Sequence, residues 1–169
     1  CFPVPLARDL DTLELVSKAI SGFGDDAIDG AGAVLAEHGV EVESSVAAAF
    51  QNALGALQAH PKKVSLAHKQ SRIRFAGFIQ VSREMAQHLR GVAMSDHLAK
   101  LLTYGPKRSL TDLAQDNAII AETREAVQAI VEREGFLIMP TVPNVAFPHS
   151  QAEPAAQADF TCLANIAGL

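Results

Sequence analysis

The amino-acid sequence predicts an α/β fold in which helices predominate. Two observations support this prediction. A helix-like segment followed by a short strand-like segment occurs twice before residue 67, and a long amphipathic stretch over 109–134 leads into the apolar run 136–139. Amphipathic stretches of about ten residues or more favour helices, and short apolar runs between breakers favour buried strands. A chain of 169 residues, 49% hydrophobic and 20% charged, can bury a sizeable core as one globular domain.

The N-terminal part is expected to contain two helices and a short strand. Leucines recur at helical spacing after the first prolines, and Asp9 and Asp11 suit the positive end of a helix dipole. Gly39 suits the left-handed residue that commonly follows a helix. The predicted elements are a helix over 5–16, a loop within 21–32, a helix over 27–38 and a strand over 40–43.

The middle of the chain is expected to be mainly helical. Pro61 follows one amphipathic segment, and Gly105 ends another. Ser109 is a suitable N-cap with Asp112 three residues later, an arrangement similar to the capping box. The predicted elements are a helix over 45–59, a strand over 63–66, helical structure over 70–105, and a long helix over 109–134 that Gly135 ends.

The apolar run 136–139 is predicted to be a buried strand that continues into a proline-bearing loop. A strand buried on both faces normally has partner strands on both sides. The predicted strands 40–43 and 63–66 are too polar to be obvious partners. We therefore expect the main neighbours of this strand to lie outside the sequence.

Charge and composition argue against several classes of function. The formal net charge is −5 and basic residues occur as short pairs, which gives no footprint for nucleic acid. No apolar run approaches the roughly 20 residues that span a bilayer, and the start lacks the regions of a signal peptide. The six histidines show no metal-ligand spacing, and no glycine motif indicates a nucleotide. Two cysteines, Cys1 and Cys162, need not pair, so we expect a cytoplasmic protein without a membrane partner.

Two segments near the C-terminus are the most informative. Pro140-Thr141-Val142-Pro143 directly follows the predicted strand, at the sheet edge where ligands bind in open α/β folds. The chain closes with Phe160-Thr161-Cys162-Leu163-Ala164-Asn165-Ile166-Ala167-Gly168-Leu169. From the residues alone, the first segment is a rigid turn. The second is a helical turn with Thr161 as its cap and Asn165 as a satisfied polar group.

Both segments resemble the carboxyl-side part of the amidase signature hydrolases, which carry a strand, a Pro-Thr-x-Pro turn and later a Thr…Asn-x-x-Gly-Leu-Pro segment. Residues 2–13 resemble a second family pattern, Phe-Asp-Thr-x-Gly-Pro-Leu-Ala-Arg, in which residues 5–8 agree and the turn at 3–4 departs. Two roles are open for Arg8. It supports a catalytic centre or, as we favour, pairs with a neighbouring carboxylate.

The resemblance implies a mixed central sheet flanked by helices, of which residues 1–169 form a single, incomplete, helix-rich portion. Enzymes of this family are amidohydrolases that cleave carboxamides without a metal or organic cofactor. Their Ser–cis-Ser–Lys triad lies in a Gly-Gly-Ser-Ser-Gly-Ser-like run. No such run occurs here, so the triad of the implied hydrolase lies outside this chain. The chain alone, a fragment of an amidase, is expected to carry no catalytic residue and to be inactive.

The resemblance also implies residues that support the substrate pocket. These are Thr141, Pro143, Thr161 and Asn165, with the Thr141 hydroxyl acting through other groups. The implied partners are a small-molecule amide and the missing remainder of the amidase domain, and a homo-oligomer is compatible with the sequence.

Two other interpretations stay open, and a third is disfavoured. The A-type component of a glutamyl-tRNA amidotransferase uses the same triad but transfers ammonia and needs partner subunits. A non-enzymatic helical interaction module would have a sheet that is complete within the chain. Cys1 as an N-terminal nucleophile is disfavoured, because a proline-rich segment follows it at once and no oxyanion-binding constellation is seen.

Overall fold

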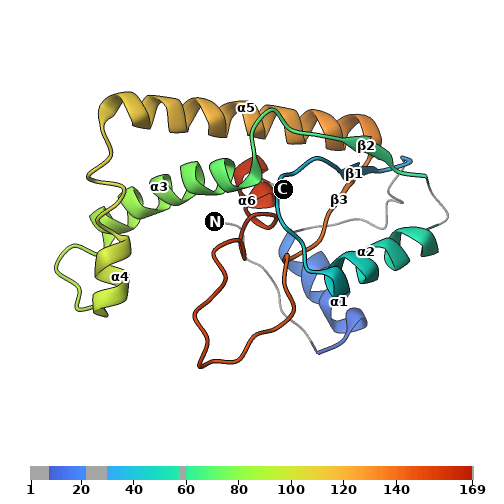
Figure 1. Ribbon diagram of the computed structural model, residues 1–169, viewed down its shortest axis with the longest axis horizontal. Coiled ribbons are helices and arrows are strands. Elements are labelled where there is room, and N and C mark those ends of the chain that lie inside the picture. The colour runs from blue at the N-terminus through green and yellow to red at the C-terminus, as the bar shows by residue number, and fades with distance from the viewer. Residues whose placement is uncertain (1–7, 22–29, 58–59, 169) are drawn as a thin grey trace.

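The computed structural model describes residues 8–21, 30–57 and 60–168. Helices surround a small parallel sheet (Figure 1), so the predicted helix-rich α/β class is confirmed. In chain order the elements are α1 Leu10–Ser21, β1 Ala33–Leu35, α2 Ser44–Ala56, β2 Lys62–Val64, α3 Gln70–His88, α4 Asp96–Leu101, α5 Leu110–Glu134, β3 Leu137–Ile138 and α6 Cys162–Ala167.

The sheet has the strand order β2-β1-β3, and both pairs are parallel. Ala33 of β1 pairs with Lys62 of β2 on one side and with Leu137 of β3 on the other. A parallel pair needs a crossover connection, which α2 supplies between β1 and β2. The described strands are all parallel, so the antiparallel pairs of the expected mixed sheet are not found among them.

The central strand β1 corrects the predicted helix over 27–38, whose described C-terminal part is a strand and a loop. Alanine, leucine and glutamate favour helices, but tertiary packing overrides such preferences. Gly32 has φ +77, and a Cβ atom there would lie 2.4 Å from the ring of Phe136. This close approach places β1 against β3, and all three residues of β1 are buried.

The run 136–139 also differs from the prediction. Its neighbour β1 lies in this chain, so the expectation that its main neighbours lie outside the sequence is wrong on that side. The strand itself covers only Leu137–Ile138 and is half-buried. The predicted strand over 40–43 is wrong, because these residues form an irregular segment that runs to the loop after β3. There the backbone N–H of Glu43 donates to the carbonyl of Pro143 at 2.8 Å.

Several helix boundaries agree with the sequence. The Ser109 hydroxyl accepts from the N–H of Asp112 at 3.1 Å, and α5 ends at Gly135 with φ 90, so both predicted ends are confirmed. The carboxylate of Asp9 accepts from the N–H of Thr12 at 2.8 Å at the start of α1. The helical structure predicted over 70–105 is interrupted, because α3 ends at His88 and α4 begins at Asp96.

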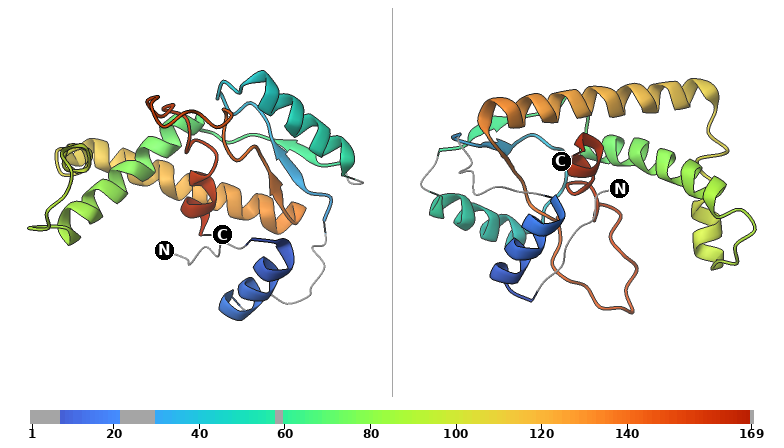
Figure 2. Two further views of the ribbon diagram at one scale, coloured as in Figure 1. Left: turned by 90° about the horizontal axis from the view of Figure 1, so that it is seen from below. Right: turned by 180° about the vertical axis from the view of Figure 1, so that it is seen from behind.

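Helices α3 and α5 pack side by side and run in opposite directions. His68, just before α3, pairs with Glu122, whereas Arg72 further along α3 pairs with Asp116, which comes earlier in α5. The short helix α6 lies between these helices and the sheet in all three ribbon views (Figures 1 and 2). The buried core is built around it: Leu35, Ile73, Val127, Phe160, Leu163, Ile166 and Ala167.

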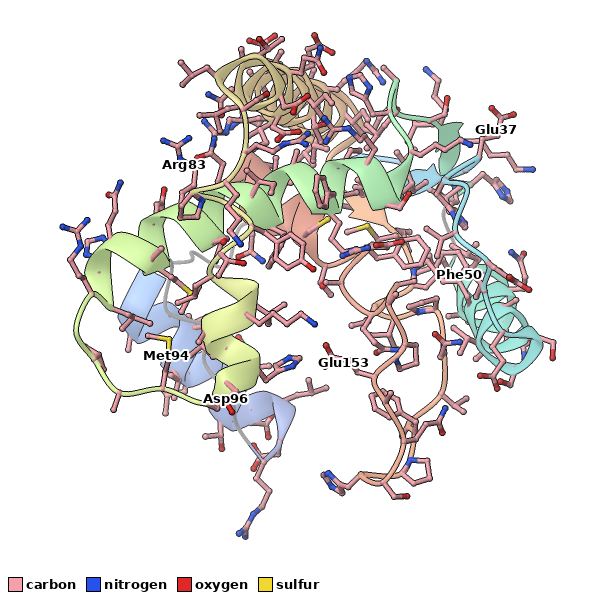
Figure 3. The ribbon with its side chains drawn as sticks, turned by 60° about the vertical axis from the view of Figure 1, so that its left-hand side comes forward. Glu37, Phe50, Arg83, Met94, Asp96 and Glu153 are labelled. Atoms are coloured by element: carbon pink, nitrogen blue, oxygen red, sulfur yellow. The ribbon has the colours of Figure 1, made fainter. Side chains whose placement is uncertain are left out.

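Helices α2 and α4 lie at opposite ends of the molecule. Figure 3 shows Phe50 of α2 at one end and, at the other, Asp96 at the start of α4 and Met94 just before it. Cys1, residues 2–7 and most of the predicted loop 21–32 lie outside the described residues. Within the described part of the chain, no helix has the length and apolar character needed to cross a lipid bilayer.

Candidate functional site

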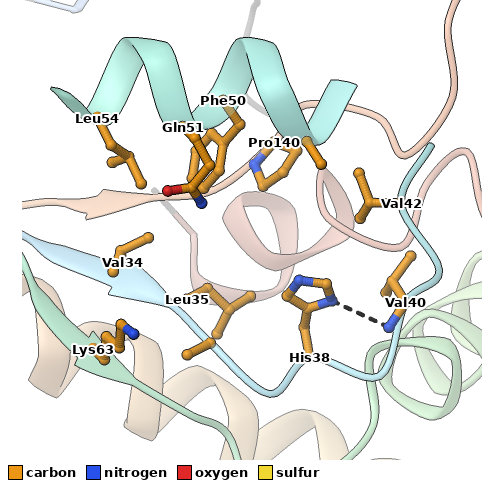
Figure 4. A pocket seen from close by; sticks show the side chains of 12 residues that line it. Val34, Leu35, His38, Val40, Val42, Phe50, Gln51, Leu54, Lys63 and Pro140 are labelled. Carbon is orange, nitrogen blue, oxygen red and sulfur yellow. Dashed lines mark hydrogen bonds between the residues drawn. The ribbon is translucent and has the colours of Figure 1, made fainter. Parts of the chain in front are cut away.

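The carboxyl edge of the sheet is the candidate site. Because β1 and β3 are parallel, the segments that follow them, 36–38 and 140–143, leave the sheet at the same edge. Ligands of open α/β sheets bind at this edge. Helix α2 lies over one face of the sheet, and a cavity of about 370 Å³ separates it from β1 (Figure 4).

The wall of this cavity is mainly apolar. Side chains of α2 form its upper side in Figure 4, while β1 and the irregular segment after it form the lower side. The lining residues are Val34, Leu35, Ala36, His38, Val40, Val42, Ala47, Phe50, Gln51, Leu54, Lys63 and Pro140. Apolar cavities with a few convergent polar groups are typical of small-molecule sites.

His38 is the polar group with the best-defined orientation. Its Nδ1 accepts a hydrogen bond from the N–H of Val40 at 3.1 Å, so the neutral ring carries its proton on Nε2. Its ring meets Phe160 edge to face, with 4.9 Å between ring centroids. Burial lowers the pKa of His38, so the ring is uncharged at neutral pH. In Figure 4 the side of the ring away from Val40 is directed into the cavity.

Two further polar side chains approach the same space. Gln51 projects from α2 toward the sheet, and Lys63 projects from β2 (Figure 4). Both residues line the cavity and are exposed. The arrangement therefore offers a neutral N–H donor from His38, an amide from Gln51 and an ammonium group from Lys63.

The four predicted supporting residues lie in two separate places. Thr141 is exposed on the loop after β3, whereas Pro143 is buried and its carbonyl accepts from Glu43. Thr161 and Asn165 are exposed on α6, where the Asn165 amide donates to the carbonyl of Thr161 at 3.4 Å. Thr161 holds the N-cap position of α6, but its side chain forms no capping hydrogen bond.

The neighbouring Pro140 lines the cavity, so the Pro-Thr-x-Pro turn and the cavity share one wall. The sequence assigned no role to His38 or Gln51. His38 was the last residue of the predicted helix over 27–38, and only the presence of a strand at 33–35 places it at a carboxyl edge. In the sequence, Ala33-Val34-Leu35 is too short to show a period, so no local signal marked the strand that positions His38.

Cys162 is a poor nucleophile in this structure. Burial, helped by the negative charge of Asp159, raises the pKa of its thiol to about 11. The reactive form of cysteine is the thiolate, so this side chain stays protonated at neutral pH. In residues 8–21, 30–57 and 60–168, no three His, Cys, Asp or Glu side chains are placed to hold a metal ion together.

Two larger hollows lie elsewhere. One, of about 670 Å³, is lined at the corner of α3, α4 and α5 by Lys100, Lys107 and Arg108 among others. The other, of about 570 Å³, lies beside the loop after β3 and includes Glu41, Glu43 and Asp159. No residue of the Pro140–Pro143 turn is found in the described lining of either hollow, whereas the lining of the cavity under α2 includes Pro140.

Comparisons with protein-family models, with curated proteins and with solved structures found no match for this chain. The carboxyl-edge cavity is therefore interpreted from its own geometry and from the residues that surround it.

Proposed function

We propose that this chain is the carboxyl-side portion of an amidase signature hydrolase and that the carboxyl edge of its sheet forms one wall of the amide cleft. The observation that carries this proposal is the position of the Pro-Thr-x-Pro turn. It directly follows a strand of a parallel sheet, at the edge where such folds bind ligands. The same turn is part of the resemblance to the family.

The second resembling segment supports the proposal through its packing. Phe160 and Leu163 are fully buried between α3, α5 and the sheet. From α5, Arg124 Nε donates to the carbonyl of Ile166 at 2.8 Å, and Gln128 Nε2 donates to that of Ala167 at 2.9 Å. These contacts hold α6 in a defined place, as a segment that supports a cleft requires.

In the proposed reaction a serine from outside this chain attacks the amide carbonyl. Its oxygen forms a bond to the acyl carbon, the C–N bond breaks, and ammonia or an amine leaves with a proton from the lysine-assisted serine pair. Water then cleaves the acyl–oxygen bond and releases the acid. This chain contributes the wall at 140–143, where the exposed Thr141 hydroxyl supports the groups that act on the substrate.

The test compares this chain with a longer product of the same gene that includes upstream sequence. Ammonia release from benzamide is the measurement. We expect release from the longer protein and none from the 169-residue chain. In the longer protein, Thr141→Val should lower kcat/KM by roughly tenfold, which corresponds to about 1.4 kcal/mol of transition-state stabilisation.

Thr103→Val is the matched control, because Thr103 is also exposed but lies beside α4 at the other end of the molecule. Equal decreases of kcat/KM in the two variants would show that Thr141 has no specific role in the reaction. Amide hydrolysis by the 169-residue chain alone would contradict a triad outside it. Ammonia transfer to glutamyl-tRNA in place of release would identify an amidotransferase component instead.

A further inference from the structure

We infer that the cavity between α2 and β1 binds a small, uncharged apolar molecule through a carbonyl oxygen that accepts a hydrogen bond from His38 Nε2. This inference does not depend on the proposed amidase role, because it rests on the cavity alone. The occupant is defined by three features of the wall: its volume, its apolar character and the type of donor that it offers.

The volume and the lining of the cavity indicate the size and the apolar character of the ligand. About 370 Å³ is enough for an aromatic or short aliphatic molecule. The floor consists of Val34 and Leu35, and Phe50 and Leu54 of α2 lie opposite (Figure 4). Phe50 and Leu54 are partly exposed in the described structure, so a ligand would remove apolar surface of α2 from water.

The hydrogen bond to Val40 selects the polar group of the ligand. Because Nδ1 of His38 is occupied as an acceptor, the neutral ring presents only an N–H donor to the cavity. No hydrogen-bond partner of Nε2 is found within the described residues. A donor beside apolar side chains is complemented by an acceptor such as a ketone, ester or amide oxygen.

The charges around the cavity argue for an uncharged ligand. Besides His38, the only ionisable residue among the described residues of the lining is Lys63, which is exposed. An anion inside would lose its hydration and gain a single hydrogen bond from a neutral ring, which does not compensate the loss. A cation would face Lys63 and the N–H of His38, with no acidic partner among the lining residues that the structure describes.

The experiment uses three rigid probes of similar size with the full 169-residue chain: acetophenone, its carbonyl-free analogue α-methylstyrene, and benzoate. Binding is followed by chemical-shift changes in ¹H–¹⁵N spectra at about pH 7.5, where His38 is neutral. We expect saturable binding of acetophenone, with shifts at Val40 and α2. One hydrogen bond should make acetophenone bind about fivefold tighter than α-methylstyrene.

Three variants test whether the affinity for the probes depends on the His38 donor and on the cavity. His38→Phe keeps an aromatic ring against Phe160 but removes the donor, so acetophenone and α-methylstyrene should bind equally within about twofold. Ala47→Phe fills the cavity from α2 without changing His38 and should abolish binding of both. Ala49→Phe is the matched control, since Ala49 is exposed on the same helix and does not line the cavity.

Three outcomes would overturn the inference. They are the absence of saturable binding by acetophenone, tighter binding of benzoate than of acetophenone, and equal losses in the Ala47→Phe and Ala49→Phe variants. None of the three concerns ammonia release, so this inference and the proposed function can fail separately.

Discussion

At the scale of single residues, the carboxylate of Asp116 joins α3, α5 and the segment before α5. It is 0% exposed and accepts hydrogen bonds from Arg72 and from Arg108. The two guanidinium groups also lie over the ring of Phe75, at 5.9 and 5.3 Å from its centroid. Burial alone raises the pKa of Asp116, but the hydrogen bonds and charges of the two arginines outweigh it and hold the pKa below its usual value.

Asp116→Asn should therefore lower the free energy of unfolding by about 3 kcal/mol, because two partly buried arginines lose their counter-charge. Urea unfolding followed by circular dichroism measures the change. Asp112→Asn is the matched control: Asp112 pairs with the same Arg108 but its side chain is 45% exposed, so its loss should stay below about 1 kcal/mol. Equal losses in the two variants would show that burial of the Asp116 carboxylate is unimportant.

His38 makes stability depend on pH in a defined direction. Its pKa in the folded chain lies below the ordinary value of 6.5, so the unfolded chain takes up this proton first as the pH falls. The contribution of His38 to the free energy of unfolding should be nearly constant above pH 6.5. It should decrease as the pH falls from there to the folded pKa. His38→Phe should reduce the loss of stability between about pH 8 and about pH 5.5.

Urea unfolding at the two pH values measures this difference. His97→Phe serves as the control, because His97 is exposed on α4. A loss of stability as steep in His38→Phe as in the unchanged chain would assign the pH dependence to other groups.

At the scale of elements, the junction between α4 and α5 packs directly on the backbone of α3. The buried hydroxyl of Ser82 donates to the carbonyl of Leu101 at 3.0 Å and accepts from the N–H of Gly105 at 2.9 Å. A Cβ atom at Gly105 would lie 2.5 Å from the backbone nitrogen of Arg83 and 2.8 Å from the carbonyl of Ile79. Only glycine fits this approach without a shift of α3.

Gly105→Ala should accordingly destabilise the chain by about 1–3 kcal/mol, the usual cost of overpacking. Gly55→Ala is the matched control within α2, since a Cβ atom there meets nothing within 4 Å. It should stabilise by about 0.5–1 kcal/mol, because alanine favours a helix interior more than glycine does. Thermal unfolding of both variants measures the two effects. An unchanged stability of Gly105→Ala would mean that the segment between α4 and α5 does not pack tightly against α3.

The elements also show which structure the sequence could predict. Helix α5 carries its signals locally, in the Ser109 cap, the apolar face and Gly135, and its bounds are confirmed. Strand β1 carries none, because three residues cannot show a period and Ala-Val-Leu suits a helix as well. Its identity as a strand depends on pairing with β2 and β3, which are distant in sequence.

At the scale of the whole molecule, α6 is where the helical layer and the sheet share one core. Leu163 is 0% exposed and belongs to the cluster that includes Leu35 of β1, Ile73 of α3 and Val127 of α5. The apolar residues of this segment were recognised in the sequence, but their place at the centre of the core was not. No local pattern states which elements a short helix contacts.

Leu163→Ala should lower the free energy of unfolding by about 2–5 kcal/mol, because it leaves a cavity where the helices and the sheet meet. Leu110→Ala, the same change at a side chain that is 84% exposed, should cost less than about 0.5 kcal/mol. Chemical unfolding of both variants gives the comparison. A small effect of Leu163→Ala would mean that α6 is peripheral to the stability of the fold.

The candidate site was predictable only in part for the same reason. The Pro140–Pro143 turn is contiguous in sequence, so its position after a strand could be predicted. The cavity beside it combines β1, α2, β2 and Pro140, and its donor His38 follows the one strand that the sequence did not reveal. A site assembled from separate segments is visible only after the topology is known.

The place of β1 in the sheet has a consequence for the order of folding. β2 follows β1 after one helix, whereas Leu137 of β3 is about a hundred residues beyond its partner Ala33. During synthesis β1, α2 and β2 leave the ribosome close together and can pair at once, while the other edge of β1 stays open until β3 has emerged. Closing the longer loop costs more entropy and slows folding. The attachment of β3 is thus the late event, and the cavity wall at Pro140 is completed last.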